Sequence, residues 1–274
     1  MTSPYVIWTI IFTVVPLLII IFYSFAQRDA FGDVVYKFTL SNYKDFFEPI
    51  YLNVFWRSLK LSLISTVICL FLGYPMAFIM SRSKGLKQNL MVMLFILPLW
   101  TNFLLRTYAW MGLLRYQGII NELLIKLGLI SEPITMLYTN SAVVLGMVYN
   151  FLPFMVLPIF SVLSKMDKSL IEAARDLGAN EMNVFMKIIF PLSFPGVATG
   201  IVMVFMPAVS TFVISDLLGG GQTILLGNLI QNQFMAARNW QFGSSVSVIM
   251  MIFLIISMGY FAKHSSKDGG GKIW

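Results

Sequence analysis

The chain has 274 residues, of which 58% are hydrophobic and only 11% are charged, and its mean hydropathy is +0.81. A soluble domain carries about a quarter charged residues, so this composition excludes an ordinary soluble protein and indicates that most of the surface faces lipid. The net charge of +7 does not indicate nucleic acid as a partner, because the basic residues stand in short loops beside apolar runs, where they orient a membrane protein.

Six segments are long and apolar enough to cross a membrane, which takes about 20 residues of helix. The sequence therefore predicts an all-α integral membrane protein with six transmembrane helices. The first segment is predicted to be a retained helix and not a signal peptide, because no Lys or Arg precedes it. The segments are residues 5–26, 58–80, 90–114, 141–163, 191–216 and 244–262.

Shorter elements are predicted between and after these segments. Residues 39–48 predict a helix cap followed by a short amphipathic helix, and residues 118–130 predict another short helix that ends at Gly128. The three glycines at 219–221 predict a flexible break after the fifth segment, and the terminal KDGGGKIW is predicted to be disordered.

The distribution of Lys and Arg favours a cytoplasmic location for both termini. In that orientation the inner loops 81–89 and 164–190 and the tail carry ten Lys and Arg residues, whereas the much longer outer loops carry eight. Basic residues are therefore denser on the inner side, as the positive-inside rule requires. The predicted organisation has a first transmembrane helix with an outer loop (1–57), a transmembrane core (58–262) and a cytoplasmic tail (263–274).

The sequence contains no motif for nucleotide, metal or covalent chemistry. It has no G-x-x-x-x-G-K-[ST] loop, no H-E-x-x-H motif and one cysteine, Cys69, inside an apolar run. Its single histidine, His264, lies in the basic tail, so no serine or cysteine in a membrane segment has a histidine to activate it. We therefore expect no catalytic residue, no metal site and no cofactor, and an energy source in an ion gradient or another chain.

The loop between the fourth and fifth segments combines charged residues with helical periodicity. Gly178 divides it into two predicted helices. Ala173 and Ala174 have small side chains that let another surface approach the backbone, and Glu172 and Asp176 lie one helical turn apart beside them. Periodicity alone leaves two interpretations open, a helix that docks in a groove of a partner and an amphipathic linker that lies on the membrane surface.

The spacing in this loop resembles the EAA motif of permeases in bacterial ABC importers, EAA-x3-G-x9-I-x-L-P. The chain matches it throughout, except that Phe190 replaces the leucine. In that family the loop forms the coupling helix, which docks into a separate ATPase subunit. The resemblance implies the type I importer permease fold and a coupling role for six residues. They are Glu172, Ala173, Ala174, Asp176, Gly178 and Pro191.

Other segments resemble the members of this family that import spermidine and putrescine. The resemblance implies a bacterial inner-membrane subunit that works with two ATPase subunits, a second homologous permease and an external polyamine-binding protein. Importers of another cationic solute remain a rival interpretation, as do a gradient-driven secondary transporter, against which the EAA spacing argues, and a membrane scaffold. The segments are LPLWTNFLLRTYAW (97–110), NSAVVLGMVYNFLPFMVLP (140–158), SDLLGGGQTILLGNLIQNQF (215–234) and RNWQFGSS (238–245).

Aromatic and amide side chains gather near the outer halves of the third and fourth segments. Aromatic faces attract ammonium groups, and a polyamine carries such groups joined by apolar methylenes. The alternative is an aromatic belt at the membrane interface. The candidates for the substrate pathway in these two segments are Trp100, Asn102, Tyr108, Tyr149 and Asn150.

Asp216 is the only acidic residue inside a predicted transmembrane segment. A carboxylate at the centre of a membrane helix costs about 2.5–3.5 kcal/mol, so such residues are candidates for function. Three interpretations are open: contact with substrate, an ion pair with Arg106 of the third segment, and simple exposure near the outer end of the helix.

Small residues and prolines inside the segments have structural interpretations. Gly196 and Gly200 are four residues apart and predict a close contact between helices. Each internal proline frees a backbone carbonyl, which either faces a wet cavity or accompanies a packing kink. The prolines are Pro75, Pro98, Pro153, Pro158 and Pro207.

Overall fold

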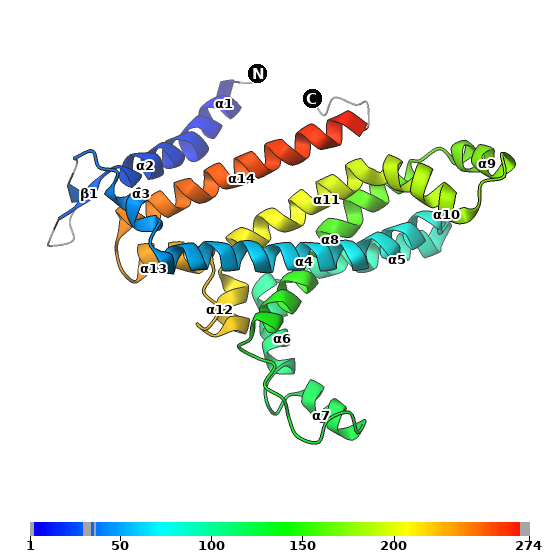
Figure 1. Cartoon of the computed structure of the whole chain (residues 1–274), viewed down its shortest axis with the longest axis horizontal. Coiled ribbons are helices and arrows are strands. Elements are labelled where there is room, and N and C mark those ends of the chain that lie inside the picture. Colours follow the sequence, from blue (N-terminus) through cyan, green and yellow to red (C-terminus); the bar gives the residue numbers. More distant parts are fainter. Residues whose placement is uncertain (1–2, 30–33, 36, 269–274) are drawn as a thin grey trace.

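Three long helices form the centre of the protein. In the computed structural model, which describes residues 3–29, 34–35 and 37–268, α4 (Pro49–Arg82), α8 (Asn140–Ser164) and α11 (Phe190–Ser210) pack against one another (Figure 1). The main core lies between them and includes Cys69 of α4 and Met155 of α8. These helices form because each is an apolar run of spanning length.

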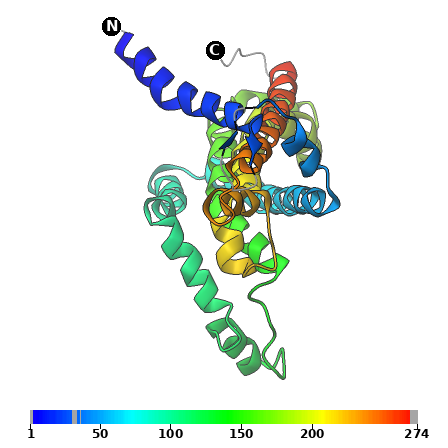
Figure 2. The ribbon, with the colours of Figure 1, turned by 90° about the vertical axis from the view of Figure 1, so that its left-hand side faces the viewer.

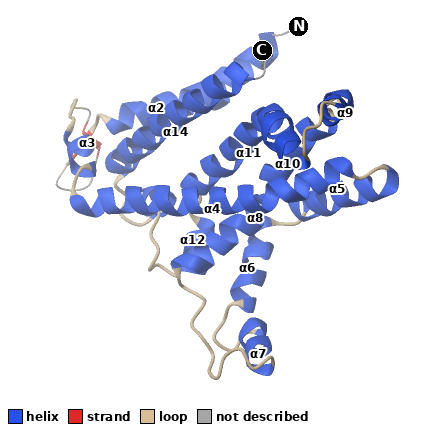
Figure 3. Cartoon of the chain, turned by 45° about the vertical axis from the view of Figure 1, so that its right-hand side comes forward, coloured by secondary structure: helices blue, strands red, loops and turns tan. Residues whose placement is uncertain are grey.

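A second layer joins the beginning and the end of the described chain. Helix α14 (Trp240–Asp268) lies beside α2 (Val15–Ser24) and α11, and the termini lie at the same end of the molecule (Figures 1 and 3). Short elements also precede α4. Helix α1 (Ser3–Thr9) and the π-helical turn η1 (Ile10–Val14) lead into α2 from its N-terminal side. The antiparallel strands β1 (Gln27–Arg28) and β2 (Val34–Val35) and helix α3 (Ser41–Phe46) lie at the other end of α2.

An arm extends away from the bundle between α5 (Gly85–Trp100) and α8. It consists of α6 (Phe103–Leu113), α7 (Ile119–Lys126) and their loops, as Figure 2 shows. The expected short helices over 39–48 and 118–130 are therefore present as α3 and α7.

The described residues contain five helical segments that are long and apolar enough to cross a membrane, or six if the bent pair α5–α6 is one span. The predicted all-α fold is confirmed, but several bounds differ from the prediction. Helix α4 begins with Pro49 in its first turn and not at residue 58, and α14 begins at Trp240 and continues to Asp268. Residues 269–274 of the expected disordered tail lie outside the described residues.

The prediction of one continuous helix over 90–114 is wrong. Helices α5 and α6 meet at an angle of 94°. The side chain of Asn102 accepts a hydrogen bond from the backbone N–H of Leu104 at 2.8 Å, so it caps α6 and starts a new helix in a new direction.

The prediction of one helix over 191–216 is also wrong. Helix α11 ends at Ser210, and Asp216 lies on a separate helix, α12 (Val213–Gly219). Phe212 is the N-cap residue of α12, and its carbonyl accepts a hydrogen bond of 3.0 Å from the side chain of Asn228, which holds the start of the new helix in place. Asn228 belongs to α13 (Leu226–Met235), a helix that the sequence analysis did not predict.

Glycines set the distance between α11 and α8, as predicted. A Cβ atom on Gly196 would lie 3.0 Å from the Pro158 carbonyl oxygen and 3.1 Å from the Ile159 Cα atom. On Gly200 it would lie 2.7 Å from the Met155 sulfur. The two helices therefore approach each other more closely than side chains at these positions allow.

Candidate functional site

The loop with the EAA spacing forms a corner of two helices, α9 (Lys168–Asp176) and α10 (Glu181–Val184). Asp167 caps α9 by accepting a hydrogen bond of 2.9 Å from the Ser169 N–H, and this bond lowers the pKa of the Asp167 carboxyl. The residue Gly178, which was predicted to divide the loop, has φ of +81°. The two predicted helices are confirmed, and the second continues into the fifth span.

The end of α9 is a Schellman motif. The N–H of Ala179 donates to the Ala174 carbonyl at 3.0 Å, and the N–H of Gly178 donates to the Arg175 carbonyl at 2.8 Å. This motif needs a residue in the left-handed conformation, which glycine adopts without a steric cost. The glycine of the EAA spacing is thus the residue that turns the chain.

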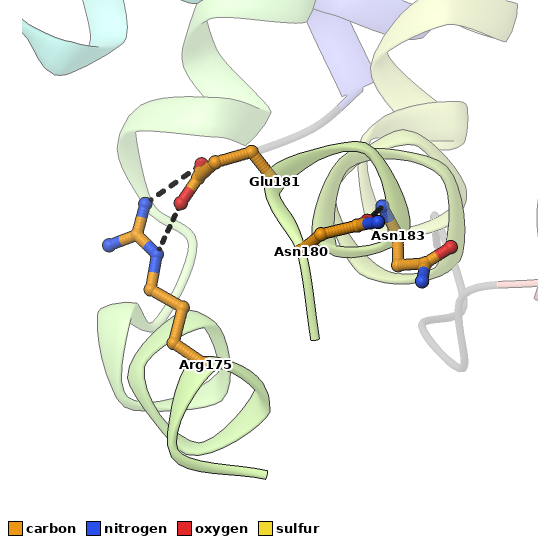
Figure 4. A network of polar contacts seen from close by, with 4 residues as sticks. All are labelled: Arg175, Asn180, Glu181 and Asn183. Carbon is orange, nitrogen blue, oxygen red and sulfur yellow. Dashed lines mark hydrogen bonds and ion pairs between the residues drawn. The ribbon is translucent and has the colours of Figure 1, made fainter. Parts of the chain in front are cut away.

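An ion pair and a second cap hold the corner, as Figure 4 shows. The Arg175 guanidinium donates two hydrogen bonds to the Glu181 carboxylate, of 2.8 and 3.0 Å, and the pair raises the pKa of Arg175. The Asn180 side chain accepts a hydrogen bond of 2.8 Å from the Asn183 N–H. The corner therefore has a fixed angle although most of it is exposed.

The two faces of α9 have different surroundings. Ile171 and Ala174 pack against the core of the bundle. Leu170, Ala173 and Leu177 are exposed on the outside, and 89% of the Leu177 side chain is accessible. Glu172 and Asp176 are exposed beside them. The corner thus presents an apolar strip with charges at its edge, which has the character of a docking surface.

Pro191 lies where the corner joins the fifth span. It follows a π-helical turn, η2 (Phe185–Ile189), in which the Phe190 N–H bonds to the Phe185 carbonyl, five residues back. Proline has no N–H for the carbonyl four residues before it and its ring crowds that carbonyl, which accounts for the wider turn. The same arrangement precedes Pro16, where the Val15 N–H bonds to the Ile10 carbonyl.

A cavity of about 590 Å³ lies beside the break between α5 and α6. Asn150, 1% exposed, is part of its lining, and its Oδ1 atom has no hydrogen-bond partner among the described residues. Its Nδ2 atom donates to the Gly146 carbonyl at 2.9 Å. Arg106 also lines the cavity, and its Nε and Nη1 atoms lack partners in the described part of the chain. The cavity is therefore polar on one side, and Pro207 of α11 borders it.

The other predicted pathway residues on these helices lie apart from that cavity. Trp100 ends α5 with 81% of its surface exposed, and Tyr108 is exposed on α6. Tyr149 packs edge-on against Trp110, with ring centroids 5.3 Å apart. Asn102 uses its side-chain oxygen to cap α6. Of the residues predicted for the pathway, the structure places Asn150 in this cavity.

Asp216 is exposed on α12 and pairs with an amide, not with a cation. Its carboxylate accepts a hydrogen bond from Nδ2 of Asn228, and it forms no ion pair with any of the described residues. The predicted alternative of an Arg106–Asp216 pair is therefore not formed. Helix α12 lies on α8 at Gly146, where an added Cβ atom would lie 2.4 Å from Leu218 Cδ1.

Asn228 is the residue of this region that the sequence analysis missed. It is 3% exposed, and its amide also accepts hydrogen bonds from the Ser215 hydroxyl and the Leu225 N–H. The sequence signal that could have indicated this residue is a single amide side chain inside the apolar run LLGNLI. Across the described residues, no three His, Cys, Asp or Glu side chains lie close enough together to hold a metal ion.

The bundle, its close-packed central helices and its exposed helical corner define a permease of the ABC importer type. The chain belongs to the family of binding-protein-dependent transport system inner membrane components, whose model matches residues 1–268. It is accordingly a multi-pass membrane protein.

Named relatives and solved structures agree with this assignment. The chain is 43% identical over 249 residues to the spermidine/putrescine transport system permease protein PotB of Haemophilus influenzae, covering 91% of this chain and 87% of that protein. It is also 43% identical to PotB of Escherichia coli K12, covering 90% of each chain. The inner membrane ABC transporter permease protein YdcU of the same organism is 27% identical, over 90% of this chain and 82% of that protein.

The fold itself matches two solved transporters. A chain of a bacterial ABC transporter involved in the import of the acidic polysaccharide alginate has a TM-score of 0.80 at 14% identity and covers 96% of this chain and 93% of its own. A chain of the MetNI methionine ABC transporter has a TM-score of 0.58 at 15% identity, and the match covers 80% of this chain and 95% of that chain. The predicted fold of an ABC importer permease is confirmed.

Proposed function

We propose that this chain is the permease subunit of an ATP-driven importer that carries polyamines, spermidine and putrescine, into the cytoplasm. Family membership supports the role of permease. The names of the 43% identical relatives support the substrate class. The observation that carries the proposal is the corner of α9 and α10, which offers an exposed apolar strip with charged edges at the end of two spanning helices.

The proposed assembly contains this chain, a second homologous permease, two ATPase subunits that bind ATP, and an external polyamine-binding protein. The chain sits in the bacterial inner membrane with both termini in the cytoplasm, as the density of basic residues favours. The ATPase subunits dock on the α9–α10 corner through the outward Ala173, with Glu172 and Asp176 beside it. Ala174, which faces the bundle, lets α9 lie close to the core. Gly178 and Pro191 fix the geometry of that corner.

The packing offers a physical route from the corner to the cavity. Helix α10 continues through η2 into α11, so a pull on the corner displaces one continuous span. Helix α11 touches α8 closely at Gly196 and Gly200, and its far end at Pro207 borders the cavity that contains Asn150. Closure of the ATPase dimer would therefore change the shape of the cavity, and the bundle would switch between inward and outward opening.

The proposed substrate pathway runs along α6, the first half of α8 and α12. Ammonium groups lose water there, so aromatic faces and polar atoms must replace it. Tyr149 and Asn150 offer a ring and a free amide oxygen on α8, and Asp216 offers an exposed carboxylate. Trp100, Asn102 and Tyr108 are proposed at the entrance, because they stand at or after the bend between α5 and α6.

Reconstitution tests this function. The four kinds of subunit are assembled in vesicles, and uptake of labelled spermidine and putrescine is measured with ATP inside. The Ala173→Trp variant should lose uptake because a bulky ring in the exposed strip separates the ATPase from the corner. Leu127→Trp changes another exposed apolar residue, after α7, and should transport normally.

The outcomes separate the possibilities. Uptake of another cationic solute, with no uptake of polyamines, would change the proposed substrate but leave the proposed ATP-driven importer in place. Uptake driven by an ion gradient without ATP would contradict the proposal. Normal uptake and normal ATPase binding by Ala173→Trp would remove the coupling role from the corner.

A further inference from the structure

A pocket of about 420 Å³ opens on the bundle side of the α9–α10 corner. It is lined by the last turns of α4 and α8, the beginning of α5 and the inner face of α9. Four cationic side chains and one carboxylate take part in the lining. These are Arg82, Lys84, Lys168, Arg175 and Glu172.

Two of the four cations already have a neighbour. Arg175 forms the ion pair with Glu181, and the Arg82 guanidinium lies 4.2 Å from the centre of the Phe78 ring. Lys84 and Lys168 are exposed, and neither forms an ion pair within the part of the chain that the structure describes. The pocket therefore has an excess of positive charge even when Glu172 and Glu181 are both counted.

The pocket also has neutral lining groups, some apolar and some hydroxyl-bearing. Phe78, Leu163 and Ile189 belong to spanning helices and give the pocket apolar lining. The hydroxyls of Ser81 and Ser164 also line it, but they donate to carbonyls of their own helices, at 2.8 and 3.1 Å. The ammonium groups of Lys84 and Lys168 and the Arg82 guanidinium are thus the donors left over for a ligand, in a pocket that also has apolar lining.

We propose that this pocket binds the phosphate headgroup of an anionic phospholipid from the cytoplasmic leaflet. The proposal rests on the orientation given under the proposed function. Basic pockets at the cytoplasmic ends of spanning helices suit such headgroups, because anionic lipids give that surface a negative potential. The apolar lining formed by Phe78, Leu163 and Ile189 suits the start of an acyl chain.

An acidic side chain of the ATPase fits less well. The residues of α9 that line the pocket, Ile171, Glu172 and Arg175, are not those of the outward strip, which contains Ala173 and Leu177. A protein that docks on the outward strip would leave the pocket on the bundle side of α9 free for a lipid.

The lipid would connect parts of the chain that are separate in sequence. Lys84 precedes α5, and Lys168 begins α9. A phosphate between them would tie the corner to the membrane end of the bundle and limit its movement. The charge of the surrounding lipid would then regulate how firmly the ATPase is coupled to transport.

The test uses the assembled importer in nanodiscs of phosphatidylcholine, with or without phosphatidylglycerol. The measurements are the unfolding temperature and the lipids retained in native mass spectrometry. Phosphatidylglycerol should raise the unfolding temperature by on the order of 3 °C and remain bound. The variant Lys84→Gln/Lys168→Gln should lose both effects. The control Lys87→Gln/Lys187→Gln removes the same charge on the same side of the bundle, outside the pocket lining, and should keep both effects.

Several outcomes would overturn the proposal. Equal lipid effects in both double variants would mean that the pocket does not bind the headgroup. The same temperature rise with inorganic phosphate in phosphatidylcholine alone would identify a soluble anion as the ligand. Loss of the ATPase subunits from Lys84→Gln/Lys168→Gln with lipid still bound would assign the pocket to the ATPase. These measurements need neither polyamine nor ATP, so their failure is distinct from failure of the proposed function.

Discussion

At the scale of single residues, the environment of Asp216 depends on one buried amide. Asn228 accepts two hydrogen bonds at its oxygen and donates two from its nitrogen, one of them to Asp216. An amide can make no more than these four. The Asp216 carboxylate is therefore held in place and remains exposed without the partial neutralisation that a cation would provide.

The charge of Asp216 can be tested separately from its position. Asp216→Asn keeps the shape and an oxygen that accepts from Asn228, but it removes the negative charge. We expect the initial rate of polyamine uptake to fall about tenfold or more, because a hydrogen bond to a charged group contributes about 1.5–3 kcal/mol and 1.4 kcal/mol is a factor of ten. Asp45→Asn changes another exposed acid, on α3, and should not affect uptake. Unchanged uptake by Asp216→Asn would remove the substrate role.

Asn228 itself should matter for stability. Asn228→Leu leaves the buried Leu225 N–H without its partner. It also removes one hydrogen bond each from the Phe212 carbonyl and the Ser215 hydroxyl, which keep their bonds within α12. Buried groups left unsatisfied cost about 1–3 kcal/mol each, so we expect a lower unfolding temperature of the purified subunit. Asn239→Leu would serve as a comparison, because that side chain makes one cap, at 3.2 Å to the Phe242 N–H. If both variants have the same unfolding temperature, the contact between α12 and α13 does not depend on the Asn228 amide.

At the scale of elements, the α9–α10 corner depends on a left-handed residue. Gly178→Ala adds no contact, because a Cβ atom there has nothing within 4 Å, but a left-handed alanine costs about 1–2 kcal/mol. We expect the corner to lose its fixed angle and ATP-driven uptake to fall while the protein still inserts. Gly128→Ala has the same kind of strain, with φ of +69° and open space, at the end of α7. Equal uptake by the Gly178→Ala and Gly128→Ala variants would argue against a role of the α9–α10 corner in coupling.

The contact of α11 with α8 should determine the stability of the bundle. Gly196→Ala places a methyl group against the backbone of α8, which cannot move aside as a flexible side chain does. We expect a loss of about 1–3 kcal/mol, seen as a lower unfolding temperature in detergent. Gly259→Ala, on α14 with nothing within 4 Å, is the control and should be neutral. A neutral result for Gly196→Ala would show that the helices can separate without cost.

Sequence patterns predicted the spans well because apolar composition alone determines which segments lie in the membrane. They failed where a helix breaks inside an apolar run. The breaks at Thr101 and Thr211 are invisible to hydropathy, since one depends on the cap at Asn102 and the other on a distant amide, Asn228. The turn at Gly178 could be predicted from the local sequence. The location of Asp216 could not, because it depends on a hydrogen bond with Asn228, a residue later in the chain.

At the scale of the whole molecule, the proposed orientation can be tested by labelling. Cysteines in place of Lys84 and Lys168 should react with thiol reagents from the cytoplasmic side alone. Both positions are exposed at the corner end of the bundle, and Cys69 is buried and is replaced by serine as the background. A cysteine in place of Lys126, on the α6–α7 arm, should react from outside intact cells and serves as the control. Labelling of Lys84→Cys from outside would reverse the topology.

The pairing of α2 with α14 has a consequence for biosynthesis. Helix α2 is made and inserted long before α14, the spanning helix that it touches. None of the residues in the most apolar window of the span Val6–Ser24 is buried in the finished protein. A helix that is apolar on all sides needs no protein partner in lipid. Helix α2 can therefore be inserted early in translation. It can remain in the bilayer without a protein partner until α14 is synthesised and inserted beside it.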